Sequence, residues 1–215
     1  MKKAIISIVL VLMTGMIMAQ GLHFGPRAGF TVSKFIETNE FSGSADYTSK
    51  LGFQLGATAE FEILSFIYLG TTISLYQKGY NNDIIFGKNK NTFSFLDIPI
   101  EIGYKMPIGN VSVFGQVGPY VSVALAGRSR TIVTIEDPEP WMEDEEHSYS
   151  LYEEGYEYYK RFDTGLSVAA GVDFKQYQLR VNYAFGLSDF IANEYTKAHI
   201  SSFSLTAAYL FGRNY

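Results

Sequence analysis

The stretch SFSLTAAYLFG, residues 202–212, decides the fold. Its residues alternate in character, and one side carries Phe203, Leu205, Ala207, Tyr209 and Phe211. The other side carries Ser202, Ser204, Thr206, Ala208 and Gly212. Successive side chains of a β-strand point to opposite faces, so this period of two predicts a strand with one apolar and one polar side.

Seven earlier segments repeat this alternation. They are residues 22–33, 51–62, 67–80, 92–106, 111–128, 162–174 and 178–188. Pro99 interrupts the fourth of them, and we expect a β-bulge there because proline has no N–H to donate to a ladder. The chain is therefore predicted to be all-β, with eight strands.

The links between the segments alternate between short and long. Tight turns are expected near 64–65, 107–110 and 175–177, and longer links at 34–50, 81–91, 129–161 and 189–199. Bacterial outer-membrane barrels have short periplasmic turns and longer outer loops. We therefore predict an eight-stranded antiparallel transmembrane β-barrel, an up-and-down meander in the bacterial outer membrane with both termini in the periplasm.

The first residues have the pattern of a secretory signal peptide. Lys2 and Lys3 precede an apolar run from Ala4 to Met13, and Ala19 offers a small residue for cleavage. We predict a signal peptide over residues 1–19 and a barrel domain over residues 20–215. The alternative of an uncleaved anchor is less favoured because the run is shorter than the ~20 residues that a spanning helix needs.

Composition excludes some classes of protein. The chain has 17 Lys and Arg against 22 Asp and Glu and no concentrated basic segment, so we expect no nucleic-acid partner. It has no cysteine, so neither a lipidation site at the cleavage point nor a disulfide framework is available. Its 16 Tyr and 17 Phe suit the aromatic girdles of a membrane barrel, which would be surrounded by outer-membrane lipid and lipopolysaccharide.

The polar faces of the predicted strands carry charges that decide between two kinds of barrel. They are Arg27, Glu60, Lys78, Asp97, Glu101, Lys105, Asp173 and Arg180. In a soluble lipocalin-like barrel these would face water, whereas in a membrane barrel they would face the lumen. We favour the lumen, and eight strands leave only room for side chains inside. Arg27 and Arg180 are expected to pair with Glu60, Glu101 or Asp173 in a plugged interior.

Several strand motifs resemble those of a known family. The segment FLDIPIEIGY, residues 95–104, is similar to the "YLEIPL…KY" strand of the PorT-like outer-membrane β-barrel family of Bacteroidetes. GQVGPYV at 115–121, DTGL with AGV at 163–172, and RVNYAFGL at 180–187 resemble later strands of that family in the same order. The resemblance implies an outer-membrane barrel and a possible link to protein secretion, and it supplies no catalytic motif and no cofactor.

The link between the fifth and sixth segments is acidic and aromatic, and it departs from the family pattern. Residues 136–157 hold ten carboxylates, and the candidate contact residues are Trp141, Glu143, Asp144, Glu145, Glu146, Tyr149 and Tyr152. Exposed aromatic residues are favoured anchors in interfaces, so the segment 131–160 is a candidate for binding a protein partner. A divalent cation site and a merely solvated acidic loop remain alternatives, although the spacing of a calcium-binding loop is absent.

Enzymatic and channel functions are the remaining alternatives. Asp189, His199 and Ser201 could meet near the outer rim, as a hydrolase of lipid or peptide would need. A narrow solute channel would need an open lumen. We favour a non-enzymatic barrel without metal or cofactor, whose outer loop contacts a partner or the cell surface.

Overall fold

The computed structural model describes residues 21–39, 48–84, 87–133, 146–150, 160–189 and 196–213. Within them the strands are β1 (Leu22–Asn39), β2 (Thr48–Leu64), β3 (Ile67–Ile84), β4 (Gly87–Ile108), β5 (Val111–Val133), β6 (Glu146–Ser150), β7 (Phe162–Phe174), β8 (Tyr177–Gly186) and β9 (Thr196–Tyr209). No helix in these ranges is long and apolar enough to cross a bilayer.

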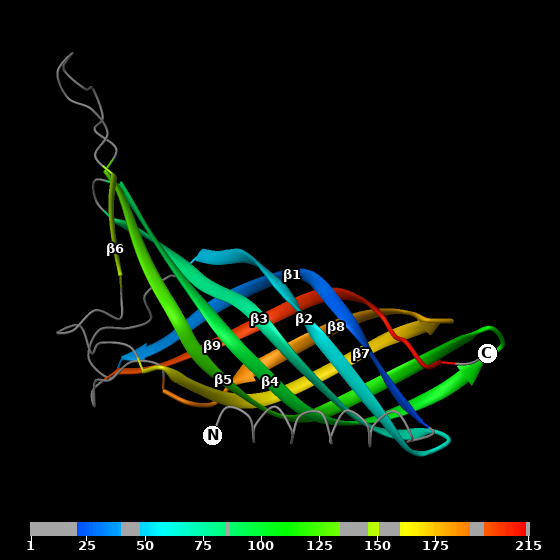
Figure 1. Ribbon diagram of the computed structural model, residues 1–215. Coiled ribbons are helices and arrows are strands. Elements are labelled where there is room, and N and C mark those ends of the chain that lie inside the picture. Colours follow the sequence, from blue (N-terminus) through cyan, green and yellow to red (C-terminus); the bar gives the residue numbers. More distant parts are fainter. Residues whose placement is uncertain are drawn as a thin grey trace, which may run out of the picture.

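Eight of the strands close into an antiparallel barrel, as predicted. Each pairs with its neighbour in the order β1-β2-β3-β4-β5-β7-β8-β9, and β9 pairs back with β1 from Arg27 opposite Ala208 to Asn39 opposite Thr196 (Figure 1). Closure leaves no free sheet edge, so the wall satisfies its own backbone hydrogen bonds in lipid. The short β6 lies outside this wall, on the far end of β5.

The three predicted tight turns are confirmed, and they lie at one end of the barrel. They connect β2 to β3, β4 to β5 and β7 to β8, and each leaves two residues between the strands. Gly109 in the second turn has φ +62°, a conformation that favours glycine. The start and the end of the described chain lie at the same end, where the Glu62 N–H donates to the Gly21 carbonyl at 2.9 Å (Figure 1).

At the opposite end, which we call the loop end, the strands run further than the sequence pattern predicted. The expected long link at 81–91 is wrong, because β3 and β4 continue as a hairpin and only residues 85–86 separate them. β6 likewise lies within the expected link at 129–161, where it pairs with residues 128–132 of β5. Ladder hydrogen bonds satisfy the backbone whether or not a strand has an apolar face, so polar residues can extend the wall.

The bulge expected at Pro99 is also wrong. Pro99 stays in register opposite Tyr120, and its carbonyl accepts a hydrogen bond from Thr71 Oγ1 at 2.8 Å. A strand residue directs its N–H toward only one neighbour, so proline removes one ladder bond without shifting the register. The irregularity between β4 and β5 occurs instead at Ser94 and Phe95, and it leaves Leu125 of β5 without an opposite residue.

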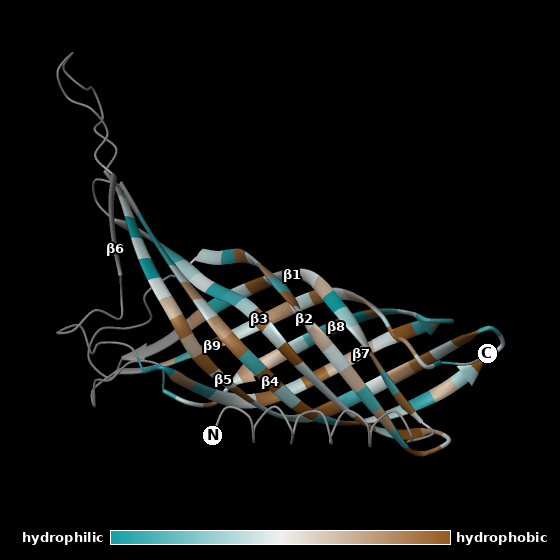
Figure 2. Cartoon of the chain, viewed as in Figure 1, coloured by the Kyte–Doolittle hydropathy of each residue, from teal (hydrophilic) through white to brown (hydrophobic). Residues whose placement is uncertain are grey.

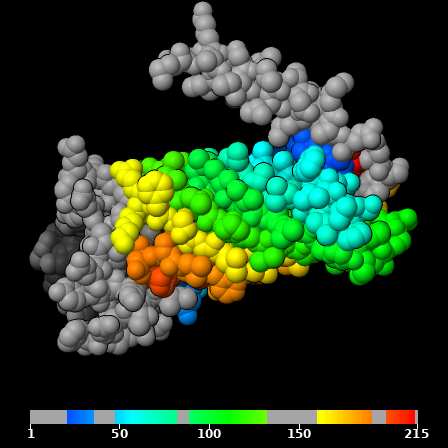
Figure 3. Space-filling model, turned by 90° about the horizontal axis from the view of Figure 1, so that it is seen from below, coloured from blue at the N-terminus to red at the C-terminus, as the bar shows by residue number. Residues whose placement is uncertain are grey.

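The apolar side of the wall faces outward, which excludes the lipocalin-like alternative. Phe30, Leu55, Ile73, Ile100 and Leu125 are each more than half exposed, whereas the alternate polar residues are buried inside. Figure 2 shows hydrophobic and hydrophilic residues alternating along the strands of the wall. In the space-filling view the side chains of neighbouring strands form a continuous wall on the face that is seen (Figure 3). Aromatic pairs lie at the turn end: Phe24 with Phe211, Phe66 with Tyr104 and Tyr177 with Tyr209. This is the surface of a membrane barrel.

Candidate functional site

The lumen is filled by charged side chains of both signs. Its described part contains Arg27, Lys78, Lys105, Arg180 and Arg213, together with Glu60, Asp97, Glu101, Asp163 and Asp173. The numbers of cations and carboxylates are equal, and all except Lys105 are at most 8 % exposed. Buried charges are costly unless they are paired and hydrogen-bonded, so their arrangement determines what the lumen can do.

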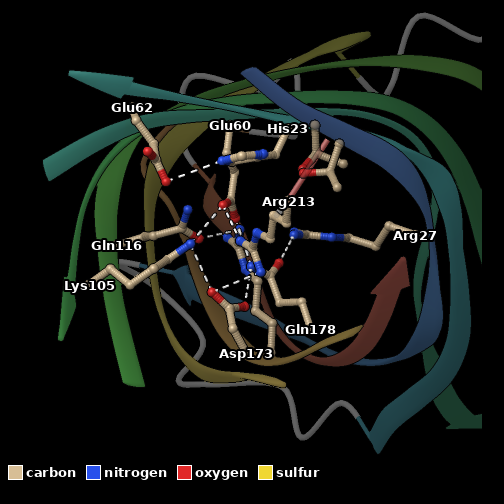
Figure 4. A network of polar contacts seen from close by, with 12 residues as sticks. His23, Arg27, Glu60, Glu62, Lys105, Gln116, Asp173, Gln178 and Arg213 are labelled. Atoms are coloured by element: carbon tan, nitrogen blue, oxygen red, sulfur yellow. Dashed lines mark hydrogen bonds and ion pairs between the residues drawn. The ribbon is translucent and has the colours of Figure 1, made fainter. Parts of the chain in front are cut away.

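The first charge cluster lies near the turn end. The Glu60 carboxylate accepts hydrogen bonds from Lys105 Nζ at 3.0 Å, Arg213 Nη2 at 2.5 Å and Gln178 Nε2 at 2.7 Å (Figure 4). Asp173 Oδ2 lies 2.8 Å from Lys105 Nζ and 3.0 Å from Arg213 Nη1. These two contacts of Asp173 are ion pairs by distance, without hydrogen-bond geometry. Two carboxylates and two cations from four parts of the chain thus neutralise one another.

The middle of the lumen contains the two arginines that the sequence predicted to form ion pairs. Arg180 Nη2 donates to Glu101 at 2.6 Å and Arg180 Nη1 donates to Gln116 at 2.7 Å. Arg27 Nη2 donates instead to the Gln178 amide oxygen at 2.5 Å. In the described interior Arg27 therefore has a neutral hydrogen-bond partner where we expected a carboxylate. Gln178 can take this role because it reaches Arg27 with its oxygen and Glu60 with its nitrogen.

A second charge cluster lies nearer the loop end. Lys78 Nζ donates to Asp163 Oδ2 at 2.8 Å, and both side chains are at most 2 % exposed. Asp163 also accepts from the hydroxyls of Ser188 at 2.9 Å and Tyr120 at 3.2 Å. The Lys78 ammonium lies within 5.3 Å of three ring centroids, those of Tyr76, Phe95 and Tyr120. Cation–π attraction from these rings adds to the pairing with Asp163.

Above the second cluster the lumen contains a cluster of apolar and aromatic side chains, although we expected a wholly polar interior. The buried side chains here are Phe35, Tyr76, Tyr80, Phe93, Phe95, Ala124, Ala198 and Ile200. The rings of Phe35 and Tyr80 stack with their centroids 4.5 Å apart. Only Phe35 and Ala198 of this cluster lie beyond the predicted strand ends, so most of its apolar side chains occupy inward positions that were expected to be polar.

One small cavity separates the two charge clusters. It has a volume of about 10 Å³, and residues from several strands line it, among them Arg27, Lys78, Asp97, Arg180, Ser204 and Thr206. This volume corresponds to about one water molecule and is too small for a solute. The charge clusters, the cavity and the aromatic residues follow one another along the lumen, so the described interior contains no continuous aqueous path.

Three residues that form the hydrogen bonds and ion pairs inside the lumen were not identified from the sequence. They are Asp163, Gln178 and Arg213. Asp163 and Gln178 lie on the same strand faces as Asp173 and Arg180, so alternation from those residues would have found them. Arg213 follows Gly212, whose φ of +83° breaks the alternation of β9. No periodic pattern would therefore place the Arg213 side chain inside the barrel.

The possible hydrolase residues do not form a triad. His199 Nδ1 lies 3.0 Å from the Ser188 carbonyl oxygen, and His199 Nε2 lies 3.7 Å from Asp189 Oδ1. Both ring nitrogens therefore face partners other than Ser201. A serine nucleophile needs a histidine nitrogen within hydrogen-bond reach, so this geometry does not support that chemistry.

Most of the acidic loop lies outside the described residues. Trp141, Glu143, Asp144, Glu145 and Tyr152 fall there, and the two remaining candidates belong to β6, where Glu146 is opposite Ile132 and Tyr149 opposite Ser129. The described ranges contain no group of three or more His, Asp or Glu residues suited to a metal ion. The cation and partner hypotheses for this loop stay predictions.

A family model identifies the class of fold, and two solved structures are reported beside it as similar proteins. The model of a family described as "Outer membrane protein beta-barrel domain" matches residues 18–192. Among solved structures, Ail, the attachment invasion locus protein of Yersinia pestis, is 13% identical, with 89% of this chain and 99% of Ail covered and a TM-score of 0.43. The outer membrane protein OprG of Pseudomonas aeruginosa is 11% identical, with coverages of 89% and 97% and a TM-score of 0.47. No curated protein matches the chain.

Proposed function

We propose, because this chain belongs to the family of outer membrane protein beta-barrel domains, that it acts as a non-enzymatic outer-membrane protein whose function lies at its loop end. The turn end and both termini would then face the periplasm, and the loops would face the cell exterior. The observation that carries the proposal is the occluded lumen, because a barrel without an aqueous path must act through what it displays.

The geometry favours this function over a narrow solute channel. Two charge clusters and the aromatic residues around Phe93 lie in series along the lumen. A solute would have to break buried ion pairs as well as separate packed rings. Each broken ion pair leaves uncompensated buried charge, which costs several kcal/mol (about 3–5 for one pair).

The surface for a partner would be the acidic loop between β5 and β7. β5 and β6 form a ladder outside the barrel wall, and that ladder supports the two ends of the segment that holds Trp141. Its carboxylates would give long-range steering of a basic partner, and its aromatic residues would supply anchors. The resemblance to PorT-like barrels makes a component of protein secretion one candidate partner.

We expect loss of the partner when the loop loses its anchors and charge. The variant replaces Trp141 and Tyr152 with Ser, and Glu143, Asp144 and Glu145 with their amides, which leaves the β5–β6 ladder intact. Crosslinking and co-purification from native outer membranes should then recover at least about tenfold less partner, as expected for loss of interface anchors.

The matched control alters a different long link, the one between β1 and β2. Glu40→Gln with Phe41→Ser changes the link between β1 and β2 and should leave co-purification unchanged. If the intact protein and the acidic-loop variant co-purify equal amounts of partner, the acidic loop is not the binding surface.

A separate measurement tests the occluded lumen. The purified protein should give no conductance steps in planar lipid bilayers, because two charge clusters and packed aromatic side chains lie in series along the described lumen. A water-filled porin in the same bilayer provides the positive control. Regular single-channel steps from this protein would support the channel alternative instead.

A further inference from the structure

Arg27 differs from the other cations of the lumen network in having no carboxylate within ion-pair distance among the described residues. The other four each lie within 3.0 Å of a carboxylate oxygen, namely Lys78, Lys105, Arg180 and Arg213. Arg27 is 3 % exposed and donates through Nη2 to the neutral Gln178 amide (Figure 4). Within the described ranges its Nε has no hydrogen-bond partner. A buried donor without an acceptor costs free energy, and more so when it is charged, so this guanidinium needs a further acceptor.

A second buried donor lies beside Arg27 on the neighbouring strand β9. Thr206 is 3 % exposed, and its Oγ1 also has no hydrogen-bond partner in the described part of the chain. On one side Thr206 is directly opposite Arg180 of β8. On the other side it is opposite Gly29 of β1, two residues from Arg27 on the same inward face. Diagonal neighbours of this kind are within reach of long side chains, so two arginines flank the Thr206 hydroxyl.

The small cavity between the two charge clusters lies where these donors meet. Arg27, Arg180, Ser204 and Thr206 all line it, and its volume is about 10 Å³. That volume holds about one water molecule, so it excludes polyatomic solutes. A monatomic anion such as chloride is only slightly larger than water and, unlike water, carries the charge that would neutralise a guanidinium.

The charges around the cavity are predominantly positive. Three cations line it, Arg27, Lys78 and Arg180, together with one carboxylate, that of Asp97. Lys78 and Arg180 have carboxylate partners of their own, so the uncompensated positive charge is that of Arg27. Asp97 belongs to β4, which is four strands from β9 in either direction around the barrel, and it accepts a hydrogen bond from Ser122. This carboxylate therefore lies across the lumen from the Thr206 hydroxyl.

We infer that the cavity between the charge clusters binds one monatomic anion, chloride under ordinary conditions, through Arg27 Nε and the Thr206 hydroxyl. Arg180 adds positive charge from the other side of Thr206, and the ion completes the neutralisation of the lumen at Arg27. The described lumen is occluded at both clusters, so the ion enters while the barrel folds. The inference concerns how the interior is closed, and it requires neither a partner of the acidic loop nor a particular orientation in the membrane.

The experiment measures how chloride changes the folding equilibrium of the purified protein. Unfolding in urea and refolding into phospholipid vesicles are compared at constant ionic strength, with sodium chloride replacing sodium gluconate, whose anion is too large for the cavity. An ion that binds only the folded barrel raises the folding equilibrium constant by about tenfold for each tenfold increase in chloride above the dissociation constant. The same equilibrium constant in chloride and in gluconate would overturn the inference and leave a water molecule as the occupant.

Substitutions of the two donors assign the chloride effect to this cavity. Thr206→Val keeps the shape but removes the hydroxyl, and it should weaken chloride binding at least about tenfold, as expected for one hydrogen bond to an ion. Arg27→Met should abolish the chloride dependence, and if that variant does not fold, Thr206→Val still decides. The matched control is Thr58→Val, which removes another buried inward hydroxyl that does not line the cavity, and it should keep the full chloride dependence. An unchanged dependence in Thr206→Val would overturn the assignment.

A direct measurement identifies the occupant. Crystals of the protein refolded in chloride, measured with long-wavelength X-rays, should show an anomalous peak from chlorine in the cavity, beside Arg27 and Thr206. A water molecule gives no such peak. Ordinary electron density in the cavity without an anomalous signal would therefore overturn the inference, even if chloride stabilises the protein.

Discussion

Glu60→Gln is expected to lower the free energy of unfolding by about 3–5 kcal/mol, the usual cost of removing one partner from a buried ion pair. Glu60 is 1 % exposed and accepts hydrogen bonds from Lys105, Arg213 and Gln178. The amide keeps the shape but removes the negative charge. Lys105 and Arg213 would then share Asp173 alone. Urea unfolding, with refolding into phospholipid vesicles, measures the change.

Glu62→Gln is the matched control, two residues further along β2. Its side chain is 44% exposed and pairs with His23 at 3.1 Å, so the expected loss is below about 1 kcal/mol. Adding Lys105→Met to Glu60→Gln should recover part of the stability, because it removes the surplus cation. Similar losses for Glu60→Gln and Glu62→Gln would show that the buried network does not stabilise the barrel.

Asp163→Asn, in the second charge cluster, is also expected to lower the free energy of unfolding by about 3–5 kcal/mol. Lys78 would keep its contacts with three aromatic rings but lose the anion that lies 2.8 Å from its ammonium. Desolvated ring contacts supply about 2 kcal/mol or more, but the rings carry no net charge and therefore do not neutralise the ammonium as a carboxylate does. Thermal unfolding followed by the gel shift of the folded barrel provides the measurement.

Two further variants show whether the loss of stability in Asp163→Asn is caused by the loss of charge pairing with Lys78. Asp189→Asn removes a rim carboxylate whose side chain is 39% exposed, and it should change stability by less than about 1 kcal/mol. Lys78→Met combined with Asp163→Asn should be less destabilised than Asp163→Asn alone, because no unpaired ammonium remains. A double variant less stable than both single variants would contradict this explanation.

The barrel wall could be predicted from the sequence because the membrane imposes a strict alternation. Residues such as Phe203 and Leu205 must face lipid, while Ser204 and Thr206 face the lumen, and a slip of one residue would reverse every side chain. The polar face also indicated most of the lumen charges, including Arg180 and Glu101. The three short turns followed from the same pattern, since each separates two alternating segments.

The loop end and the pairings inside the lumen could not be predicted in the same way. Beyond the lipid band the outward face no longer needs apolar residues, so Lys90 and Asn91 resemble a turn although they continue β4. Which cation meets which carboxylate depends on how strands distant in sequence face one another across the interior. Arg27 and Gln178 show this, because 151 positions separate two residues that form one hydrogen bond.

The position of Arg213 has a consequence for biosynthesis. Translation runs from the N-terminus, so the ribosome adds Arg213 after every other charged residue of the network. A chain that ends before Arg213 would contain Glu60 and Asp173 with one fewer cation between them, and its interior would hold surplus negative charge. The barrel can therefore reach its full stability only after the last strand is synthesised, and prematurely terminated chains would be poor competitors for membrane insertion and easier substrates for periplasmic proteases.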